Sequence, residues 1–336
     1  MGWHRFRGHD DLIEGFRRVV ARGRLAHAYL FTGPPGVGKR LFAVELGRAL
    51  LCEQPPAPLT ACDRCPACLQ IDAGTHPDFV TAGRPPEVHE LPIEVMREVC
   101  GHFGLRPARG RGKVVIVDDA DDLNEESSNC FLKTLEEPPP RSVLILIGSG
   151  RERQLPTIVS RCQVVTFAPL PPAVVREVLA ANGVEPKQLD RLVRLGAGSP
   201  GLALALADEA LWAFRDRLLK GLSARPVDPV ALSKAWMEHV EEAGKDSAAQ
   251  RKRAGLVVRL LIDFFDDLLA VASGGEARRT GPEDTARVRE LAGRLETEQA
   301  LAVLERCLEA DLQIGRRVQL VLVLEALLDA LAQRLV

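Results

Sequence analysis

The chain has 336 residues, which at about 150 residues per domain corresponds to two or three domains with their own cores. Hydrophobic residues make up 46%, charged residues 27% and aromatic residues 4%, a balance that excludes disordered, collagen-like and fibrous proteins. The 44 Lys and Arg residues and the 46 Asp and Glu residues leave a formal net charge of −2, so the chain has no overall positive field for binding nucleic acid.

The first residues, MGWHRFRGHDD, are charged where a signal peptide would need an apolar stretch. No run of about 18 uncharged apolar residues follows, so no membrane span is predicted. We therefore expect a cytoplasmic protein whose eight cysteines stay reduced. Such cysteines serve as metal ligands or as small buried hydrophobic residues rather than as disulfides.

Apolar strands and helices alternate in the first half of the chain. We expect strands over residues 28–31, 113–118 and 143–147, and helices over residues 10–24, 41–51 and 124–137. This alternation predicts a parallel α/β sheet with helices on its faces.

Beyond Phe167 the pattern changes, since a proline-rich joint is followed by helical periodicity and no convincing strand. Short helices are predicted over residues 172–183, 187–196 and 200–208. Longer amphipathic helices are predicted over residues 209–222, 229–243, 249–272, 283–296, 298–309 and 316–334. The last third should therefore be a helical bundle.

The segment GPPGVGK over residues 33–39 matches a phosphate-binding loop between a strand and a helix. Gly33, Gly36 and Gly38 let successive backbone N–H groups converge on phosphate oxygens, and Lys39 can reach the outer phosphates. These residues predict a P-loop fold.

Efficient hydrolysis at this loop is not expected. The residue after the lysine should carry a Ser or Thr hydroxyl for Mg²⁺, and here it is Arg40. Asp118 suits the metal-side carboxylate, but Asp119 stands where a longer, water-activating Glu would lie. Two interpretations stay open: the loop binds ATP or ADP without efficient turnover, or it is retained because its packing holds the fold.

Four cysteines follow the loop helix with the spacing C-x₉-C-x₂-C-x₂-C: Cys52, Cys62, Cys65 and Cys68. Four thiolates this close in sequence can surround one ion, as a tetrahedral zinc site requires. Because four sulfur ligands leave no open position, we predict a structural Zn²⁺ within the insertion 52–76. Unmetallated buried thiols and an iron–sulfur cluster are the alternatives.

Several motifs occur in one order along the chain: LAHAYLF (25–31), GPPGVGK (33–39), the four-cysteine insertion, VVIVDDAD (114–121), LKTLEEPP (132–139) and LPTIVSRC (155–162). Together they resemble the AAA+ ATPase-fold subunits of bacterial DNA polymerase III clamp loaders over about residues 1–205. The C-terminal helices are too generic to add support.

The resemblance implies an AAA+ P-loop α/β domain with a parallel sheet, then a small helical lid domain and an all-α C-terminal collar domain. We expect these parts over residues 1–168, 169–208 and 209–336. It also implies partners: other clamp-loader subunits, namely the gamma/tau motor subunits and delta, together with the sliding clamp and primed DNA.

One class of subunit in this family need not hydrolyse ATP, and presents the arginine of a Ser-Arg-Cys motif to the nucleotide of a neighbouring motor subunit. Arg161 is the matching residue, and a guanidinium inserted in trans would neutralise charge on the transferred phosphoryl oxygens. Other departures from the motor pattern agree with Arg40 and Asp119: Gly201 replaces a second sensing arginine, and Ser149 is the sole hydroxyl at the end of the third predicted strand.

Two alternatives stay open. The chain could be an active gamma/tau-type motor subunit of the same loader, or a stand-alone zinc-containing DNA-binding module. The second needs a basic face, and the local basic cluster consists of Arg106, Arg109, Arg111 and Lys113, which we expect to be solvated.

Overall fold

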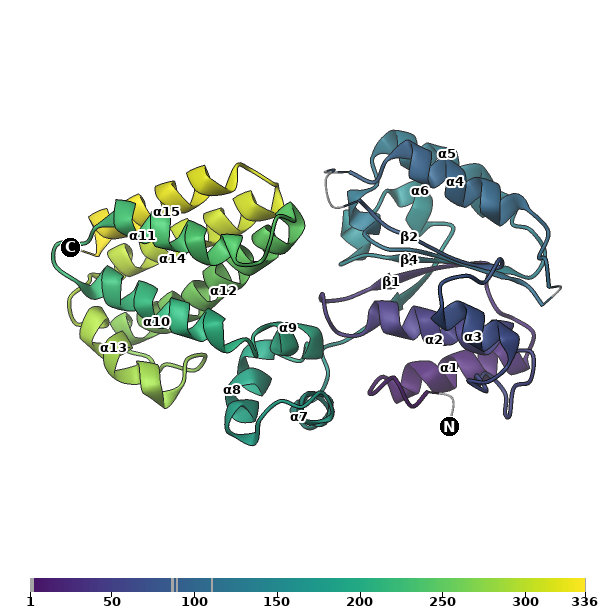
Figure 1. Ribbon diagram of the computed structural model, residues 1–336, viewed down its shortest axis with the longest axis horizontal. Helices are drawn as coiled ribbons and strands as arrows, with labels where there is room; N and C mark the ends of the chain where they lie inside the picture. Colours follow the sequence, from purple (N-terminus) through teal and green to yellow (C-terminus); the bar gives the residue numbers. More distant parts are fainter. Residues whose placement is uncertain (1–2, 86–87, 89, 110, 336) are drawn as a thin grey trace. The chain divides into compact units, whose positions relative to one another are not determined.

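The computed structural model describes residues 3–85, 88, 90–109 and 111–335. The chain divides into two compact units: Met1–Gly183 with Gly196–Leu202, and Val184–Leu195 with Ala203–Val336. The first unit is an α/β unit around one sheet, and the second unit is helical (Figure 1).

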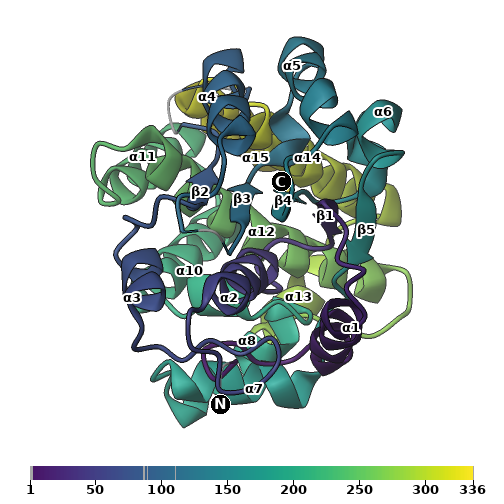
Figure 2. The same cartoon turned by 90° about the vertical axis from the view of Figure 1, so that its right-hand side faces the viewer.

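The sheet of the first unit has five parallel strands in the order β2-β3-β4-β1-β5 (Figure 2). The strands are β1 (Ala28–Thr32), β2 (Phe79–Ala82), β3 (Lys113–Val117), β4 (Ser142–Ile147) and β5 (Gln163–Thr166). The three predicted strands are confirmed as β1, β3 and β4, all fully buried. Two strands, β2 and β5, were not predicted; both are four-residue edge strands with partly exposed side chains.

Helices cover both faces of the sheet. The α/β unit contains α1 (Asp10–Ala21), α2 (Lys39–Leu51), α3 (Pro66–Asp72), α4 (Ile93–Gly104), α5 (Glu125–Glu136), α6 (Pro156–Val159), α7 (Pro172–Ala181) and the start of α9 (Pro200–Ala205). Alternate side chains of β1 point to opposite faces, so Phe31 packs with Phe16 and Phe42 of α1 and α2, and Leu30 packs with Phe131 of α5 and Met96 of α4. The sheet is therefore buried on both sides.

An aromatic cluster joins the N-terminal segment to the helix that follows the glycine-rich loop. The Phe42 ring centroid lies 4.9 Å from that of Trp3, 5.3 Å from that of Phe6 and 5.3 Å from that of Phe167. Phe42 is fully buried. Much of the chain's small aromatic content is concentrated in this cluster. Its ring contacts hold the start of α2, and with it the loop, against the sheet.

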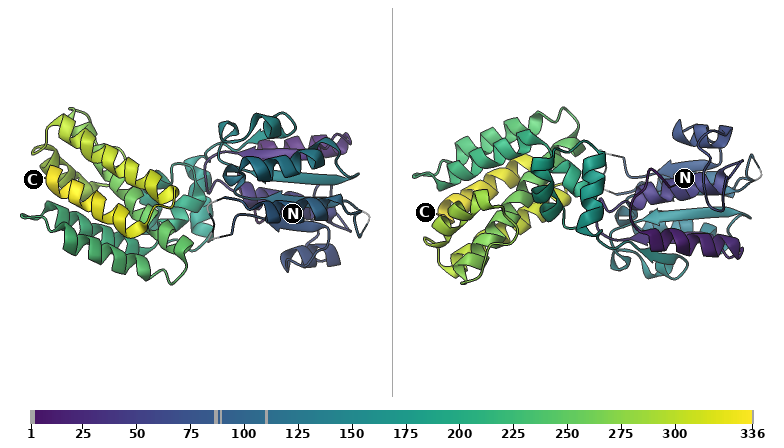
Figure 3. Two further views of the ribbon diagram at one scale, coloured as in Figure 1. Left: turned by 90° about the horizontal axis from the view of Figure 1, so that it is seen from above. Right: turned by 90° about the horizontal axis from the view of Figure 1, so that it is seen from below.

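The second unit is a bundle of amphipathic helices (Figure 3). Its helices are α8 (Pro186–Gly196), α10 (Glu209–Ser223), α11 (Pro229–Glu241), α12 (Ser247–Ala272), α13 (Pro282–Ala292), α14 (Thr297–Gly315) and α15 (Leu320–Arg334). The long α12 packs against α10, α11, α13 and α14, and its fully buried Phe264 and Phe265 lie in the core. The predicted absence of strands after Phe167 is confirmed for residues 168–335.

The helices predicted over residues 172–183, 187–196 and 200–208 are confirmed as α7, α8 and α9. The division of the chain into parts over 1–168, 169–208 and 209–336 stays a prediction. Across the described ranges, the structure contains no helix that is both long and apolar enough to cross a membrane.

Candidate functional site

The glycine-rich loop connects β1 to α2 at the carboxyl end of the sheet. Gly33, Gly36 and Gly38 have φ angles of 136°, 77° and 105°, which L side chains rarely adopt. A Cβ at Gly33 would lie 2.2 Å from the Phe167 carbonyl oxygen, so this position also lacks room for a side chain. The backbone of the loop therefore favours glycine at these three positions, and phosphate binding by them stays a prediction.

Lys39 is folded back onto its own loop. Its Nζ donates hydrogen bonds to the carbonyl oxygens of Gly33 and Pro34, the latter at 2.8 Å. The side chain is buried, and burial lowers the pKa of Lys39 although Asp121 and Asp118 oppose that shift. The ammonium that would contact phosphates is thus engaged by the loop carbonyls in this conformation.

A segment before and within α9 is bonded to the same loop. Ser199 Oγ donates to the Pro35 carbonyl at 2.8 Å, and the Gly201 N–H donates to the Gly36 carbonyl at 2.9 Å. A Cβ on Gly201 would lie 2.8 Å from Gly36 Cα, so the two backbones can approach this closely only because both residues are glycine. The position expected for a second sensing arginine is therefore occupied by a backbone contact.

Arg40 pairs with the carboxylate predicted to face a nucleotide-bound metal. Arg40 Nη1 lies 3.3 Å from Asp118 Oδ2. The next residue, Asp119, has a left-handed φ of 54°, and burial, followed by the charge of Asp118, raises the pKa of its carboxyl. The acidic end of β3 thus faces a guanidinium in the position where a hydroxyl would be needed for Mg²⁺.

A cavity of about 400 Å³ lies beside the loop, and Asp121 contributes to its lining together with Asp118 and Asp119. Its size falls within the range for small-molecule sites. Asp121 accepts hydrogen bonds from the Ser149 N–H at 2.8 Å and from Gln154 Nε2 at 2.7 Å. Asp121 was not among the predicted site residues, although its position four residues after β3 was a usable signal.

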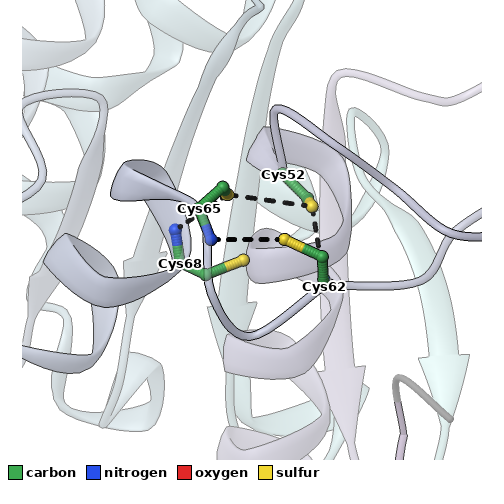
Figure 4. Close-up of side chains that lie close together, drawn as sticks. All are labelled: Cys52, Cys62, Cys65 and Cys68. Atoms are coloured by element: carbon green, nitrogen blue, oxygen red, sulfur yellow. Dashed lines mark hydrogen bonds between the residues drawn. The ribbon is translucent and has the colours of Figure 1, made fainter.

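The four cysteines lie together, as predicted from their spacing (Figure 4). Their sulfur atoms all lie within 4.8 Å of one another, and the Cys52 and Cys65 sulfurs are 4.0 Å apart. Four thiolates bound tetrahedrally to one Zn²⁺ at about 2.3 Å would have sulfurs about 3.8 Å apart, so the group fits that ion after a small contraction. A structural zinc site is therefore compatible with the geometry.

Backbone N–H groups point at these sulfurs. The N–H of Cys62 donates to Cys52 Sγ at 3.3 Å, and that of Cys65 donates to Cys62 Sγ at 3.3 Å. Burial opposes ionisation of Cys65, but bonds from the backbone of Cys68 and Glu53 and from neighbouring thiols outweigh it and lower its pKa to about 6. At Cys65 the thiolate that a metal requires is therefore favoured, whereas burial raises the pKa of Cys52 and Cys68.

A buried arginine, which was not predicted from the sequence, ties the cysteine insertion to α2. Arg48 has a fully buried side chain, and its Nη1 donates to Glu45 Oε1 at 2.8 Å. Its Nη2 donates to Asp63 at 2.6 Å and to Asp72 at 3.2 Å. Arg5 also pairs with Asp72 at 2.9 Å. These bonds hold the middle of the insertion, at Asp63, and the end of α3, at Asp72, against the loop helix.

His76 is the last residue of the insertion. It is buried, and its Nδ1 accepts a hydrogen bond from the Asp78 N–H at 3.0 Å. The group of possible ligands found among the described residues consists of the four cysteines without His76. Burial lowers the pKa of His76, which keeps the ring neutral.

Arg161 follows α6 and is about one-third exposed. Its Nε and Nη2 donate to Glu136 Oε1 at 3.1 and 2.6 Å, and its Nη1 donates to the Thr157 carbonyl at 3.0 Å. The neighbouring Cys162 has a pKa raised to about 12 by burial, which makes it an unreactive packing residue. The pairing of Glu136 with Arg161 was not predicted from the sequence.

The predicted basic cluster does not form a continuous solvated surface. Arg106, Arg109 and Arg111 are exposed, but Arg109 pairs with the Glu53 carboxylate at 2.5 Å and Arg111 donates to the Glu53 carbonyl at 2.8 Å. Lys113 is buried and donates to the His102 carbonyl, so its predicted solvation is wrong. Lys113 is the first residue of β3, and the surrounding chain covers it.

Comparisons with known proteins agree with these features. A family model described as the delta subunit of DNA polymerase III matches residues 8–171. The chain is 37% identical over 227 residues to the DNA polymerase III subunit delta' of Pseudomonas aeruginosa, covering 65% of this chain and 68% of that protein. It is 37% identical over 213 residues to subunit delta' of Escherichia coli, covering 62% of this chain and 63% of that protein.

The chain is also 31% identical over 312 residues to the gamma/tau subunit of Mycobacterium tuberculosis, covering 86% of this chain and 53% of that protein. A crystal structure of a gamma subunit-related protein from Thermotoga maritima aligns with a TM-score of 0.50 and 17% identity, covering 96% of this chain and 99% of that one. The parallel sheet, the loop and the helical unit define a P-loop protein of the AAA+ class. Within that class, this chain belongs to the delta-prime family of DNA polymerase III clamp-loader subunits.

Proposed function

We propose that this clamp-loader subunit supplies Arg161 in trans to ATP bound by a neighbouring motor subunit, and that its own loop hydrolyses ATP weakly or not at all. The observation that carries the proposal is a pair of opposite features in one unit. Arg161 is partly exposed in a Ser-Arg-Cys motif, whereas the loop has Arg40 bonded to Asp118 where a metal-binding hydroxyl is required.

The loop residues support nucleotide binding more than turnover. The backbone of Gly33, Gly36 and Gly38 and the Lys39 ammonium would hold phosphates of ATP or ADP. Of the two nucleotides, only ATP carries the γ-phosphate that is transferred in hydrolysis. Mg²⁺ fits this loop less well than the phosphates do, because the Arg40 guanidinium cannot ligate a cation. Asp118 would have to leave that guanidinium before it could help to hold a metal.

The cysteine group supports a structural role for Zn²⁺. Cys52, Cys62, Cys65 and Cys68 would hold the ion with all four positions filled, so the metal would have no open coordination site for chemistry. Its role would be to order the insertion next to α2, where Arg48 already provides a second attachment.

The partners in this proposal are the other clamp-loader subunits, including gamma/tau motor subunits and delta, with the sliding clamp and primed DNA reached through the complex. The trans arginine makes ATP turnover depend on correct assembly, because the guanidinium and the nucleotide belong to different chains.

The experiment that tests the proposal is reconstitution of the loader with variants of the full chain. Arg161→Ala should lower clamp- and DNA-stimulated ATP turnover about tenfold or more, within the range for arginine fingers. Arg153→Ala, which changes another exposed arginine of the same region, is the matched control and should leave turnover unchanged. Equal turnover in the wild-type and Arg161→Ala complexes would remove the assignment.

An active motor subunit is the second candidate, since the chain retains Lys39 and the loop glycines and is similar to gamma/tau subunits. ATP turnover by the isolated chain distinguishes the two: a motor subunit hydrolyses ATP by itself, and the proposed finger donor does not.

The stand-alone DNA-binding module has no support from the basic cluster, in which Arg109 and Arg111 contact Glu53 and Lys113 is buried.

A further inference from the structure

We propose that Glu136 is a positioning residue for Arg161: it holds the guanidinium in a resting conformation until a neighbouring nucleotide replaces it. This inference rests on the proposed function of Arg161 and names the contact that regulates it. Glu136 is the last residue of α5, and Arg161 lies 25 positions later, just after α6. The two side chains meet because α5 and α6 pack together.

The hydrogen bonds of Arg161 engage both edges of its guanidinium. A guanidinium binds phosphate bidentately through two neighbouring N–H groups on one edge, either Nε with Nη2 or Nη1 with Nη2. Nε and Nη2 both donate to Glu136 Oε1, while Nη1 donates to the Thr157 carbonyl and lies 3.3 Å from Ser160 Oγ. Bidentate contact with phosphate therefore requires Arg161 to release Glu136 or Thr157.

Charge makes the Glu136 contact the one that must be exchanged. The carboxylate neutralises the positive charge that the finger has to deliver, and it would repel the phosphate oxygens of an approaching nucleotide. Glu136 also lies in the last turn of α5, where the helix carbonyls add negative potential and strengthen the attraction for a cation. Phosphate and Glu136 thus compete for the same guanidinium.

The pair is exposed enough to be reversible. The side chains of Arg161 and Glu136 are 34% and 52% exposed, and ion pairs in such positions shift an equilibrium by only about two- to fivefold. An interaction of that strength orients the arginine in the unassembled chain without preventing its transfer to a polyphosphate. The pair is suited to control rather than to stabilising the fold.

Glu137 provides a matched control. It is the next residue, carries the same charge and is exposed, and its backbone N–H donates to the Lys133 carbonyl at 3.0 Å. Glu137→Gln changes the net charge by the same amount as Glu136→Gln and does not alter the carboxylate that contacts Arg161.

The experiment compares E136Q and E137Q in the full chain, each with and without R161A, in the reconstituted loader. We expect E136Q to raise kcat/KM for ATP about two- to fivefold over E137Q, because less of the Arg161 population is held at rest. The gain should vanish in the R161A background, as a double-mutant cycle requires for a coupled pair. In the isolated chain, the Nε–H resonance of Arg161 should shift in E136Q and not in E137Q.

An unchanged or lower kcat/KM in E136Q, or a gain that persists with R161A, would overturn the role of Glu136 while leaving the finger in place. An unshifted Arg161 resonance would overturn it as well. Unaltered turnover in R161A alone would instead overturn the proposed function, so the two failures are distinguishable.

Discussion

Arg40 and Asp118 form an ion pair with 3.3 Å between Nη1 and Oδ2, which joins the first turn of α2 to the residue after β3. Both positions normally serve the metal ion of a nucleotide, the first through a hydroxyl and the second through a carboxylate. The pair therefore supports the proposal that this loop binds Mg²⁺ poorly. A single substitution tests that proposal.

Arg40→Thr should raise the Mg²⁺-dependent affinity of the isolated chain for ATP about tenfold, or about 1.4 kcal/mol, because it adds a hydroxyl and releases Asp118. Isothermal calorimetry with and without Mg²⁺ measures this change. Arg40→Ala releases Asp118 without adding a ligand and is the control. If wild-type protein already binds MgATP tightly, or if the Thr and Ala variants bind alike, this account of the loop is wrong.

Gly201→Ala should lower the free energy of unfolding by about 1–3 kcal/mol, since its Cβ would lie 2.8 Å from Gly36 Cα and 3.0 Å from the Gly36 carbonyl oxygen. Urea unfolding monitored by circular dichroism measures the loss. Gly101→Ala, within α4 and with nothing within 4 Å of the added Cβ, should instead be neutral or stabilising. Equal stability of the two variants would show that the backbone contact between residues 201 and 36 is not tight.

Elemental analysis of protein purified without chelator should find one zinc per chain. Cys65→Ser should abolish binding and lower the thermal midpoint, because the insertion would lose the ion that orders it. Cys162→Ser removes a cysteine outside the group and should keep the metal. Metal-free wild-type protein, or iron in place of zinc, would refute the assignment.

The parts of the fold that were predicted correctly are those whose signal is local. β1, β3 and β4 are continuous apolar runs buried on both faces, and the glycine-rich loop and the cysteine group are encoded by short spacings. β2 and β5 were missed because an edge strand of four half-exposed residues has little hydrophobic pattern. Their pairing depends on the neighbouring strand rather than on their own composition.

The parts of the site that were missed depend on contacts between distant positions. Glu136 and Arg161 are separated by 25 residues, and Arg48 and Asp72 by 24. An arginine in a helix is usually expected to be solvated. Arg48 can be buried because Asp63 and Asp72 of the folded insertion pair with it, beside Glu45 of its own helix. Lys113 was misjudged for the same reason, since its partner is a carbonyl of α4.

Arg48→Met should lower the free energy of unfolding by about 3–5 kcal/mol at neutral pH, because it leaves the buried Glu45 carboxylate without its partner. Arg17→Met, which removes an exposed arginine paired with Glu14, is the control and should cost less than about 0.5 kcal/mol. Arg48→Met combined with Glu45→Gln should recover part of the loss, since no buried charge remains at that position.

The loss in Arg48→Met should also depend on pH. Burial already raises the pKa of Glu45 in the folded chain, and Arg48 is the main group that opposes this shift. Without Arg48, the pKa of Glu45 in the folded state rises still further above its unfolded value of about 4.3. The variant therefore loses stability as pH rises from that unfolded value towards the folded pKa, and regains it as pH falls back. The urea midpoints of Arg48→Met and of the wild type should therefore approach each other as pH falls from neutral to mildly acidic. A difference in midpoint that does not change with pH would place the cost in packing rather than in the unpaired carboxylate.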